Sequence, residues 1–181
     1  GSMFSGLMNG ILGTSYTSED SDLVATENNY AAKENELQQQ IDNIESTHPG
    51  YDEYRYDLDS IGHNPHELAS YLTALLQTYT PQSAQAELER IFSMQYTSTL
   101  TEEVEVRYRT VTRTDSEGNE YEVEVPYNYY ILHVDLENFN LSHVPVYIMG
   151  EEQLSMYAMY MSSLGNRPDL FPQSGYISKY Y

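Results

Sequence analysis

The start of one helix constrains the fold of this chain more than any other feature of its sequence. Asn64-Pro65-His66-Glu67 has the form of a capping box, with Asn64 as the N-cap, Pro65 at the first helical position and Glu67 placed to reach back to the Asn64 backbone. A helix is therefore expected to begin at Pro65. Its apolar residues recur at helical spacing: Leu68, Leu72, Leu75, Leu76 and Tyr79. This stripe requires a partner surface from other segments.

Three further helices are predicted, over residues 22–46, 81–95 and 151–164. The first contains no Gly or Pro and carries a narrow apolar stripe made of Leu23, Tyr30, Leu37, Ile41 and Ile44. The second begins at a repeat of the capping device, Thr80-Pro81. The third follows Gly150 with two acidic residues in its first turn, where the helix dipole favours negative charge, and ends at Gly165. Together they provide the surfaces that the Pro65 helix needs.

The period of the apolar residues changes from 3.6 to 2 at Ser98, which predicts a long β-hairpin over residues 98–136. The sequence Asp115-Ser116-Glu117-Gly118 is typical of its turn. We expect Arg113 to lie opposite Glu120 and Arg109 opposite Glu124, because this register gathers the apolar residues of both strands on one face.

Two prolines qualify the strand predictions. Pro126 has no backbone N–H, and the apolar phase shifts just after it, which predicts a bulge or kink over residues 126–130. A third strand is expected around residues 141–148, at an edge of the sheet because it contains Pro145.

These elements predict an α+β fold: an antiparallel sheet of about three strands, dominated by the long hairpin, with the helices packed on one face. Cystatin-like and NTF2-like arrangements both fit this description. Residues 1–21 are expected to form a flexible entry in which Gly1-Ser2 is the remnant of a tag. Residues 22–171 form a single domain, and residues 172–181 an extended tail or linker.

The composition excludes several classes of function. With 8 Lys and Arg against 28 Asp and Glu, the net charge of -20 opposes binding to nucleic acid. The chain has no Cys, which excludes disulfides, thiolate metal sites and a cysteine nucleophile within these residues. No apolar run reaches the roughly 18 to 20 residues of a membrane span.

A calcium loop is the first candidate site to fail. Asp57, Asp59 and Gly62 occupy positions 1, 3 and 6 of the loop pattern. Ile61 and Leu68, however, stand at positions 5 and 12, where the pattern needs oxygen ligands. The sequence therefore gives no support for calcium.

His63 and His66 are better explained by structure than by metal binding, the first as a loop residue and the second as position N2 of the capped helix. No carboxylate pair, nucleophile elbow or phosphate loop marks a catalytic site. We therefore assign no catalytic, cofactor or metal residue.

Nineteen tyrosines with no Trp leave one candidate surface. Tyr half-buries its ring and keeps its hydroxyl in water, so most of these residues are expected to pack on sheet and helix surfaces. A sharper interpretation is stacking on sugar or peptidoglycan. The possible interaction surface comprises Tyr51, Tyr54, Tyr56, Tyr127 and Tyr129.

Several stretches of the sequence resemble one family. YDEYRYDLDSIGHNPHELASYLTALLQTYTPQSAQAELERIFSMQY over residues 51–96, TLTEEVEVRYRTVTRT, VPYNYYILHVDL and LGNRPDLF are similar to a module of cell-wall hydrolases of Gram-positive conjugative transposons. The resemblance covers roughly residues 35–171. In that family the module stands between an N-terminal membrane anchor and a C-terminal NlpC-type cysteine peptidase that cuts peptidoglycan peptides.

The resemblance implies a non-catalytic module of an extracellular, membrane-anchored peptidoglycan hydrolase. The Cys and His motif of the peptidase is absent from this sequence, so no catalytic residue carries over. The implied role is to space or regulate the peptidase domain, with that domain and other conjugation proteins as partners, close to the cell wall. The membrane is reached only through an N-terminal anchor. An alternative is a Tyr-lined module that binds glycan or peptide of the wall.

Overall fold

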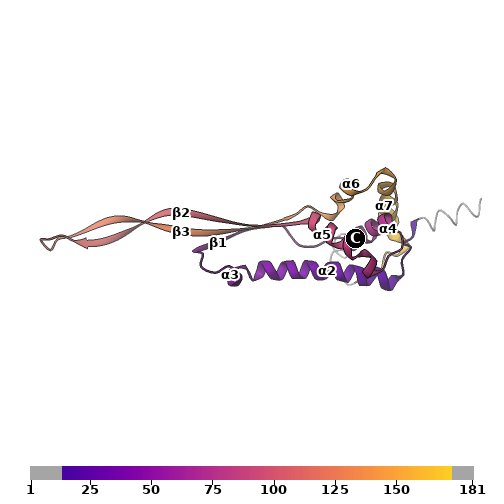
Figure 1. Ribbon diagram of the computed structural model, residues 1–181, viewed down its shortest axis with the longest axis horizontal. Coiled ribbons are helices and arrows are strands. Elements are labelled where there is room, and N and C mark those ends of the chain that lie inside the picture. Colours follow the sequence, from indigo (N-terminus) through magenta and orange to yellow (C-terminus); the bar gives the residue numbers. More distant parts are fainter. Residues whose placement is uncertain (1–13, 173–181) are drawn as a thin grey trace, which may run out of the picture. The chain divides into compact units, whose positions relative to one another are not determined.

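The computed structural model describes residues 14–172, which form an α+β fold divided into two compact units (Figure 1). We call residues 14–38, 60–97 and 137–172 the helical unit, and residues 39–59 and 98–136 the sheet unit. The predicted fold class is confirmed. The expected domain, residues 22–171, takes in the whole sheet unit and most of the helical unit, which begins at residue 14.

The helical unit holds the predicted helices close to their expected bounds. They are α2 (Asp20–Asp42), which continues into the sheet unit, α4 (Pro65–Leu76), α5 (Pro81–Gln95) and α7 (Glu151–Ser163). Two short segments of 3-10 helix, η1 (Leu141–His143) and η2 (Leu164–Asn166), and the four-residue α6 (Pro145–Ile148) complete the unit. The third strand predicted over residues 141–148 is wrong, because Pro145 stands at the first position of α6.

The caps of α4 and α5 explain where these helices begin. The side chain of Asn64 accepts a hydrogen bond from the backbone N–H of His66 at 2.9 Å, as a cap should. Glu67 Oε2 is buried and has no hydrogen-bond partner within residues 14–172. The full reciprocal box occurs at α5, where Thr80 and Ser83 exchange side-chain and backbone bonds of 3.1 and 2.9 Å.

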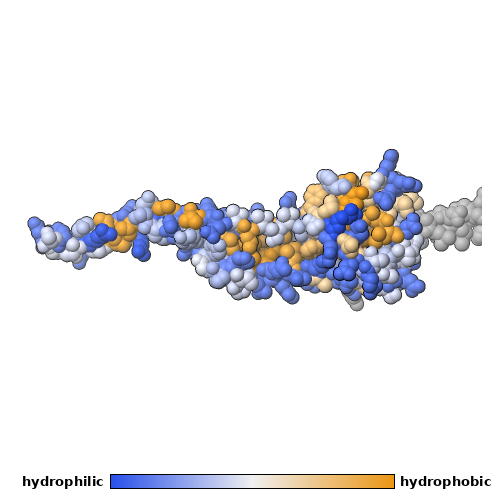
Figure 2. Space-filling view, in the orientation of Figure 1, coloured by the Kyte–Doolittle hydropathy of each residue, from blue (hydrophilic) through white to orange (hydrophobic). Residues whose placement is uncertain are grey.

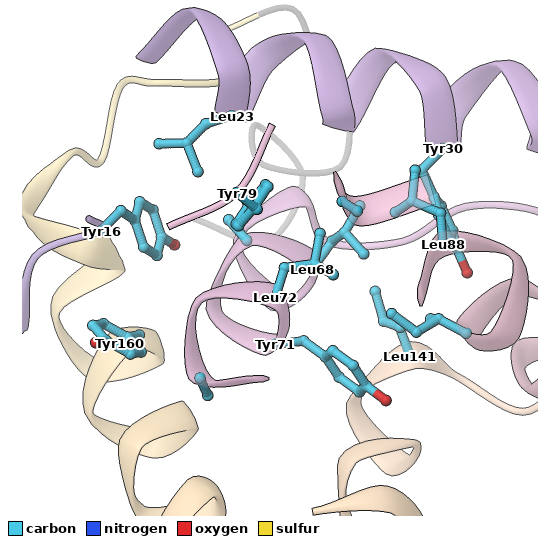
Figure 3. Packing of buried hydrophobic residues seen from close by; sticks show 14 of the residues in the cluster. Tyr16, Leu23, Tyr30, Leu68, Tyr71, Leu72, Tyr79, Leu88, Leu141 and Tyr160 are labelled. Carbon is cyan, nitrogen blue, oxygen red and sulfur yellow. The ribbon is translucent and has the colours of Figure 1, made fainter. Parts of the chain in front are cut away.

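The apolar stripe of α4 is buried by other helices and loops of the helical unit, not by the hairpin face that we expected (Figure 3). Leu68 and Leu72 are at most 1% exposed. Tyr16 and Ser18, in the segment predicted to be a flexible entry, are also buried; residues 1–13 of that entry lie outside the described residues. The cluster includes Tyr16, Leu23, Tyr30, Leu68, Tyr71, Leu72, Tyr79, Leu88, Ile91, Leu141 and Tyr160.

The sheet unit contains α3 (Ile44–Thr47) and three strands, β1 (Glu53–Leu58), β2 (Tyr96–Thr114) and β3 (Glu120–Asn138), with β2 beginning in the helical unit. The strand order is β1-β3-β2, and β1 pairs parallel to β3 from Glu53 opposite Ile131 to Leu58 opposite Leu136. The sheet is therefore mixed and not antiparallel. Its third strand is β1, a segment for which the sequence predicted no strand.

The core of the sheet unit lies near β1. Ile44 of α3 packs on Leu132 and Val134 of β3, and Tyr51 and Tyr54 cover the edge of this cluster. Beyond β1, the strands β2 and β3 continue as a two-stranded ribbon (Figure 1). This ribbon therefore has no buried face of its own.

The register of the hairpin differs from the predicted one. The Asp115 N–H donates to the Asn119 carbonyl at 2.9 Å, and at the other end the Phe139 N–H donates to the Gln95 carbonyl at 2.7 Å. Both bonds belong to one register, in which Arg113 lies opposite Tyr121 and not opposite Glu120.

Contacts between the two ends agree with this register. The Arg107 guanidinium lies over the Tyr129 ring at 3.4 Å, and His133 Nε2 lies 2.6 Å from Glu103, so odd-numbered residues of both strands share a face. A bulge near Pro126 would shift the register by one residue, and the two ends show no such shift. The predicted bulge is wrong.

The physical reason for the error is the missing core. Face matching specifies a register only where one face is buried, and the ribbon is exposed on both faces, with Tyr108 on one face at 64% and Tyr121 on the other at 46%. The geometry of the turn determines the register instead. The turn is a three-residue loop in which the Gly118 N–H bonds to the Asp115 carbonyl, and Gly118 adopts φ +87°, a conformation that glycine allows.

Candidate functional site

The tyrosines predicted to form one interaction surface lie on two opposite faces of the sheet. Because Tyr54 pairs with Leu132 and Tyr56 with Val134, both share the face that packs on Ile44. Tyr51 lies beside Tyr54, with an edge-to-face ring distance of 5.7 Å. The structure therefore brings Tyr51, Tyr54 and Tyr56 together.

The hydroxyl groups of these three tyrosines are engaged within the sheet unit. Tyr51 donates to Glu102 at 2.8 Å, Tyr54 to the His48 carbonyl at 2.6 Å and Tyr56 to Glu45 at 3.1 Å. Each bond ties the face to a neighbouring segment. This group mainly anchors β1, although Tyr56 remains 44% exposed.

Tyr127 and Tyr129 lie on the other face, with the arginines of β2. The Tyr129 hydroxyl donates to Glu53 at 2.9 Å, and the Arg107 guanidinium lies over the Tyr129 ring. Arg107 also forms an ion pair with Glu105 at 3.0 Å. Tyr127 is 38% exposed. The predicted set of five therefore does not form one surface.

The observed register creates a surface that the sequence analysis missed, which we call the Arg–Tyr face. Three of the six arginines of the chain stand on it in β2, and tyrosines and valines stand beside them in β3. No acidic residue lies among them. The members are Arg107, Arg109, Val111, Arg113, Tyr121, Val123, Val125 and Tyr127.

Two arginines of this face are exposed and have no acidic partner in the described chain. Arg109 and Arg113 are both exposed, and Tyr121 opposite Arg113 is 46% exposed. The acids of this stretch of β3, Glu120, Glu122 and Glu124, point to the opposite face, since side chains alternate along a strand. In a chain of net charge -20 this local absence of acid is unusual.

The opposite face of the ribbon carries exposed apolar residues of β2 beside these acids. Val104, Val106 and Tyr108 are 47, 60 and 64% exposed, and Tyr130 on β3 is 39% exposed. Figure 2 shows apolar residues at the surface of the β2–β3 ribbon. Side chains that contribute to no core are thus exposed on both faces.

The helical unit contains a buried polar cluster around His63, which is 7% exposed. His63 Nε2 lies 2.6 Å from Glu27 Oε1, and Nδ1 lies 2.7 Å from Glu34 Oε1, with both acids on α2. The Tyr96 hydroxyl donates to the other oxygen of Glu34, and the Tyr30 ring and the imidazole pack edge to face. The cluster joins α2 to the loop before α4 and to the start of β2.

A carboxylate beside each ring nitrogen favours the charged imidazolium form of His63. Burial alone would lower the pKa of His63, but hydrogen bonds and charge attraction from Glu27 and Glu34 outweigh burial and raise it to about 10. Burial raises the pKa of Glu27, against the bond from His63, which lowers it. We infer a charged imidazolium, because two acceptors require two N–H donors.

The sequence contained a signal for this cluster. Glu27 and Glu34 alternate with Leu23, Tyr30 and Leu37 at spacings of four and three residues, so they lie on the buried stripe of α2. A buried acid needs a partner, and His63 is the cation that meets both. Because the cluster is buried, a substrate has little access to it. We therefore interpret it as a structural contact between α2 and the loop before α4, and call it the charged pin.

Other candidate sites give little. Within residues 14–172 no group of three His, Asp or Glu side chains is arranged to hold a metal ion, and no helix there is long and apolar enough to cross a membrane. A cavity of about 330 Å³ lies between α2 and α5 and is lined by Asn29, Ala32, Lys33, Pro81, Gln82, Gln85, Leu88 and Glu89. The amide side chains that line it and its two charged residues, Lys33 and Glu89, form no catalytic arrangement.

Comparisons with known proteins found no matching family model, curated protein or solved structure.

The His63 cluster predicts a specific pH dependence of stability. A pKa raised from the ordinary value near 6.5 to about 10 contributes stability that is complete below pH 6.5 and is lost as the pH rises to 10. We expect His63→Gln to lower the free energy of unfolding most at pH 6.5 and progressively less toward pH 10, as measured by urea denaturation. His48→Gln, at an exposed position, is the control. A difference between parent and His63→Gln that stays constant from pH 6.5 to 10 contradicts the charged pin.

Proposed function

We propose that this chain is a non-catalytic interaction module that docks on other proteins through its β2–β3 ribbon. The observation that supports it is the Arg–Tyr face. Exposed tyrosines and arginines are the residue types enriched at protein interfaces, and here they lie on a ribbon that contributes to no core of the described chain. Of its three arginines, Arg107 is held by Glu105 and the Tyr129 ring, whereas Arg109 and Arg113 have no acidic partner in the described chain.

The chemistry of the face indicates the kind of partner. Arg109 and Arg113 present guanidinium groups that bind carboxylates in bidentate fashion. Tyr121 and Tyr127 add apolar area beside them, each partly exposed. The partner surface is therefore acidic with apolar residues between its acids, and attraction to this face works against the general repulsion from a chain of net charge -20.

The resemblance of the sequence to a module of conjugative-transposon cell-wall hydrolases gives this proposal its biological setting. In that setting the module is extracellular, lies in the envelope of a Gram-positive bacterium and spaces or regulates an NlpC-type peptidase domain. Its partners are that domain and other conjugation proteins. The buried pin at His63 supports a spacing role, because it holds α2 rigidly against the loop that begins α4.

Photo-crosslinking in the cells that produce the protein tests the docking face. We expect a benzophenone amino acid at Tyr121 to give adducts with a second protein, and Arg113→Glu to reduce them several-fold because it reverses the charge opposite Tyr121. The same amino acid at Tyr147 of α6, which is 69% exposed, is the matched control. Equal adducts at both positions, or adducts unaffected by Arg113→Glu, contradict docking through this face.

The alternative, a ligand-binding module for wall glycan or peptide, keeps one observation in its favour: Tyr56 and Tyr127 are partly exposed. Incubation of the purified chain with insoluble wall sacculi separates the two functions. We expect no release of soluble fragments and little pelleting of the chain, since its net charge of -20 repels the anionic polymers of the wall. Pelleting that resists salt and is lost in Tyr56→Ala or Tyr127→Ala favours the alternative, and released fragments contradict a non-catalytic module.

A further inference from the structure

We infer that a second copy of this chain pairs with the outer edge of β2, antiparallel and centred on Val106, to form a two-fold symmetric dimer. The pairing surface is the open edge of the ribbon; it shares Arg107 and Arg109 with the Arg–Tyr face but not Arg113, Tyr121 or Tyr127. The inference therefore rests on its own observations and not on the proposed function. These observations are the open edge, the order of charges along β2 and the exposed apolar row.

The outer edge of β2 is open along the ribbon. In the order β1-β3-β2, β2 is the last strand, and no strand of the described chain lies beyond it. In an antiparallel ladder alternate residues bond to the partner strand. The bonds at Gln95 and Asp115 assign the odd-numbered residues of β2 to β3, so the even-numbered residues turn their N–H and C=O groups to the open edge. Long open edges of this kind are templates for another strand.

The charge pattern along β2 is complementary to the same pattern read in the opposite direction. Three acids, Glu102, Glu103 and Glu105, precede Val106, and three arginines follow it. An antiparallel second copy centred on Val106 places its Arg107 opposite Glu105 and its Arg109 opposite Glu103. By symmetry each pair occurs twice, and opposite charges across two strands stabilise their pairing.

In the same register the exposed apolar residues of β2 lie opposite those of the second copy. Val106 lies opposite Val106 of the second copy, and Val104 lies opposite its Tyr108. These are the three most exposed apolar side chains of the row, at 47 to 64%. Pairing therefore brings exposed valine and tyrosine side chains against one another on one face of a sheet extended across both copies.

Neighbouring symmetric registers are disfavoured by like charges. Centring the pair on Arg107 places this arginine opposite its own copy, and centring it on Glu105 places two glutamates opposite each other. Like charges directly opposite are destabilising. The charge order thus selects the register centred on Val106, much as charged residues specify partners elsewhere.

Sedimentation equilibrium of the full chain across a concentration series tests the dimer. We expect a reversible monomer–dimer equilibrium. Arg109→Glu should weaken it about tenfold or more, because two acids then face each other at both symmetric positions. Adding Glu103→Arg to Arg109→Glu restores the opposite charges and should restore most of the association. A parent chain that is monomeric up to about 1 mM overturns the inference, as does a charge exchange that fails to restore pairing.

A second variant, Val106→Pro, tests the backbone hydrogen bonds of the proposed pairing. The N–H of Val106 faces the open edge, so proline removes a donor to the second copy and none to β3. We expect this variant to keep the circular dichroism spectrum of the parent and to be monomeric. A dimer unaffected by Val106→Pro shows that the copies associate elsewhere. Loss of the dimer leaves the crosslinks of Tyr121 to other proteins unchanged, so the two proposals fail separately.

Discussion

The turn at Asp115 is the interaction on which the proposed interaction surfaces of this protein depend. Its carboxylate accepts the backbone N–H groups of Glu117 and Asn119 at 2.9 and 2.8 Å, and the bond from Asn119 lowers the pKa of Asp115. The turn sets which residues of β2 and β3 share a face. A one-residue change of register would gather most apolar residues on one face and the arginines beside glutamates on the other. The observed register instead leaves Arg109 and Arg113 beside tyrosine and valine.

The two units are stabilised by different means. The helical unit has a full apolar core around α4, and a charged pin in which His63 is held between Glu27 and Glu34. The sheet unit has a core near β1 and a ribbon whose faces are both exposed. Burial therefore positions the helices, whereas backbone hydrogen bonds and the turn position the ribbon. Exposed apolar residues are retained on the ribbon, where a partner or second copy can cover them.

The features that the sequence predicts correctly lie mainly in the helical unit. The helix bounds were predictable because caps at Asn64 and Thr80 and a stripe of apolar residues act locally. The α+β class and the hairpin followed from the change of period at Ser98. The parallel pairing of β1 with β3 was not predictable, since it joins residues nearly eighty positions apart without a local signal. The register failed because face matching presumes a buried face, and the Arg–Tyr face was missed with it.

The register is tested most directly by cross-strand disulfides, for which the absence of Cys from the chain gives a clean background. In the observed register Thr112 lies opposite Glu122 in a non-hydrogen-bonded pair, where the Cβ atoms are close enough for a disulfide. The account predicts that Thr112→Cys with Glu122→Cys oxidises readily within one chain, and that Thr112→Cys with Tyr121→Cys does not. Ready oxidation of the second pair and not the first would establish the alternative register, place Arg113 opposite Glu120 and remove the Arg–Tyr face.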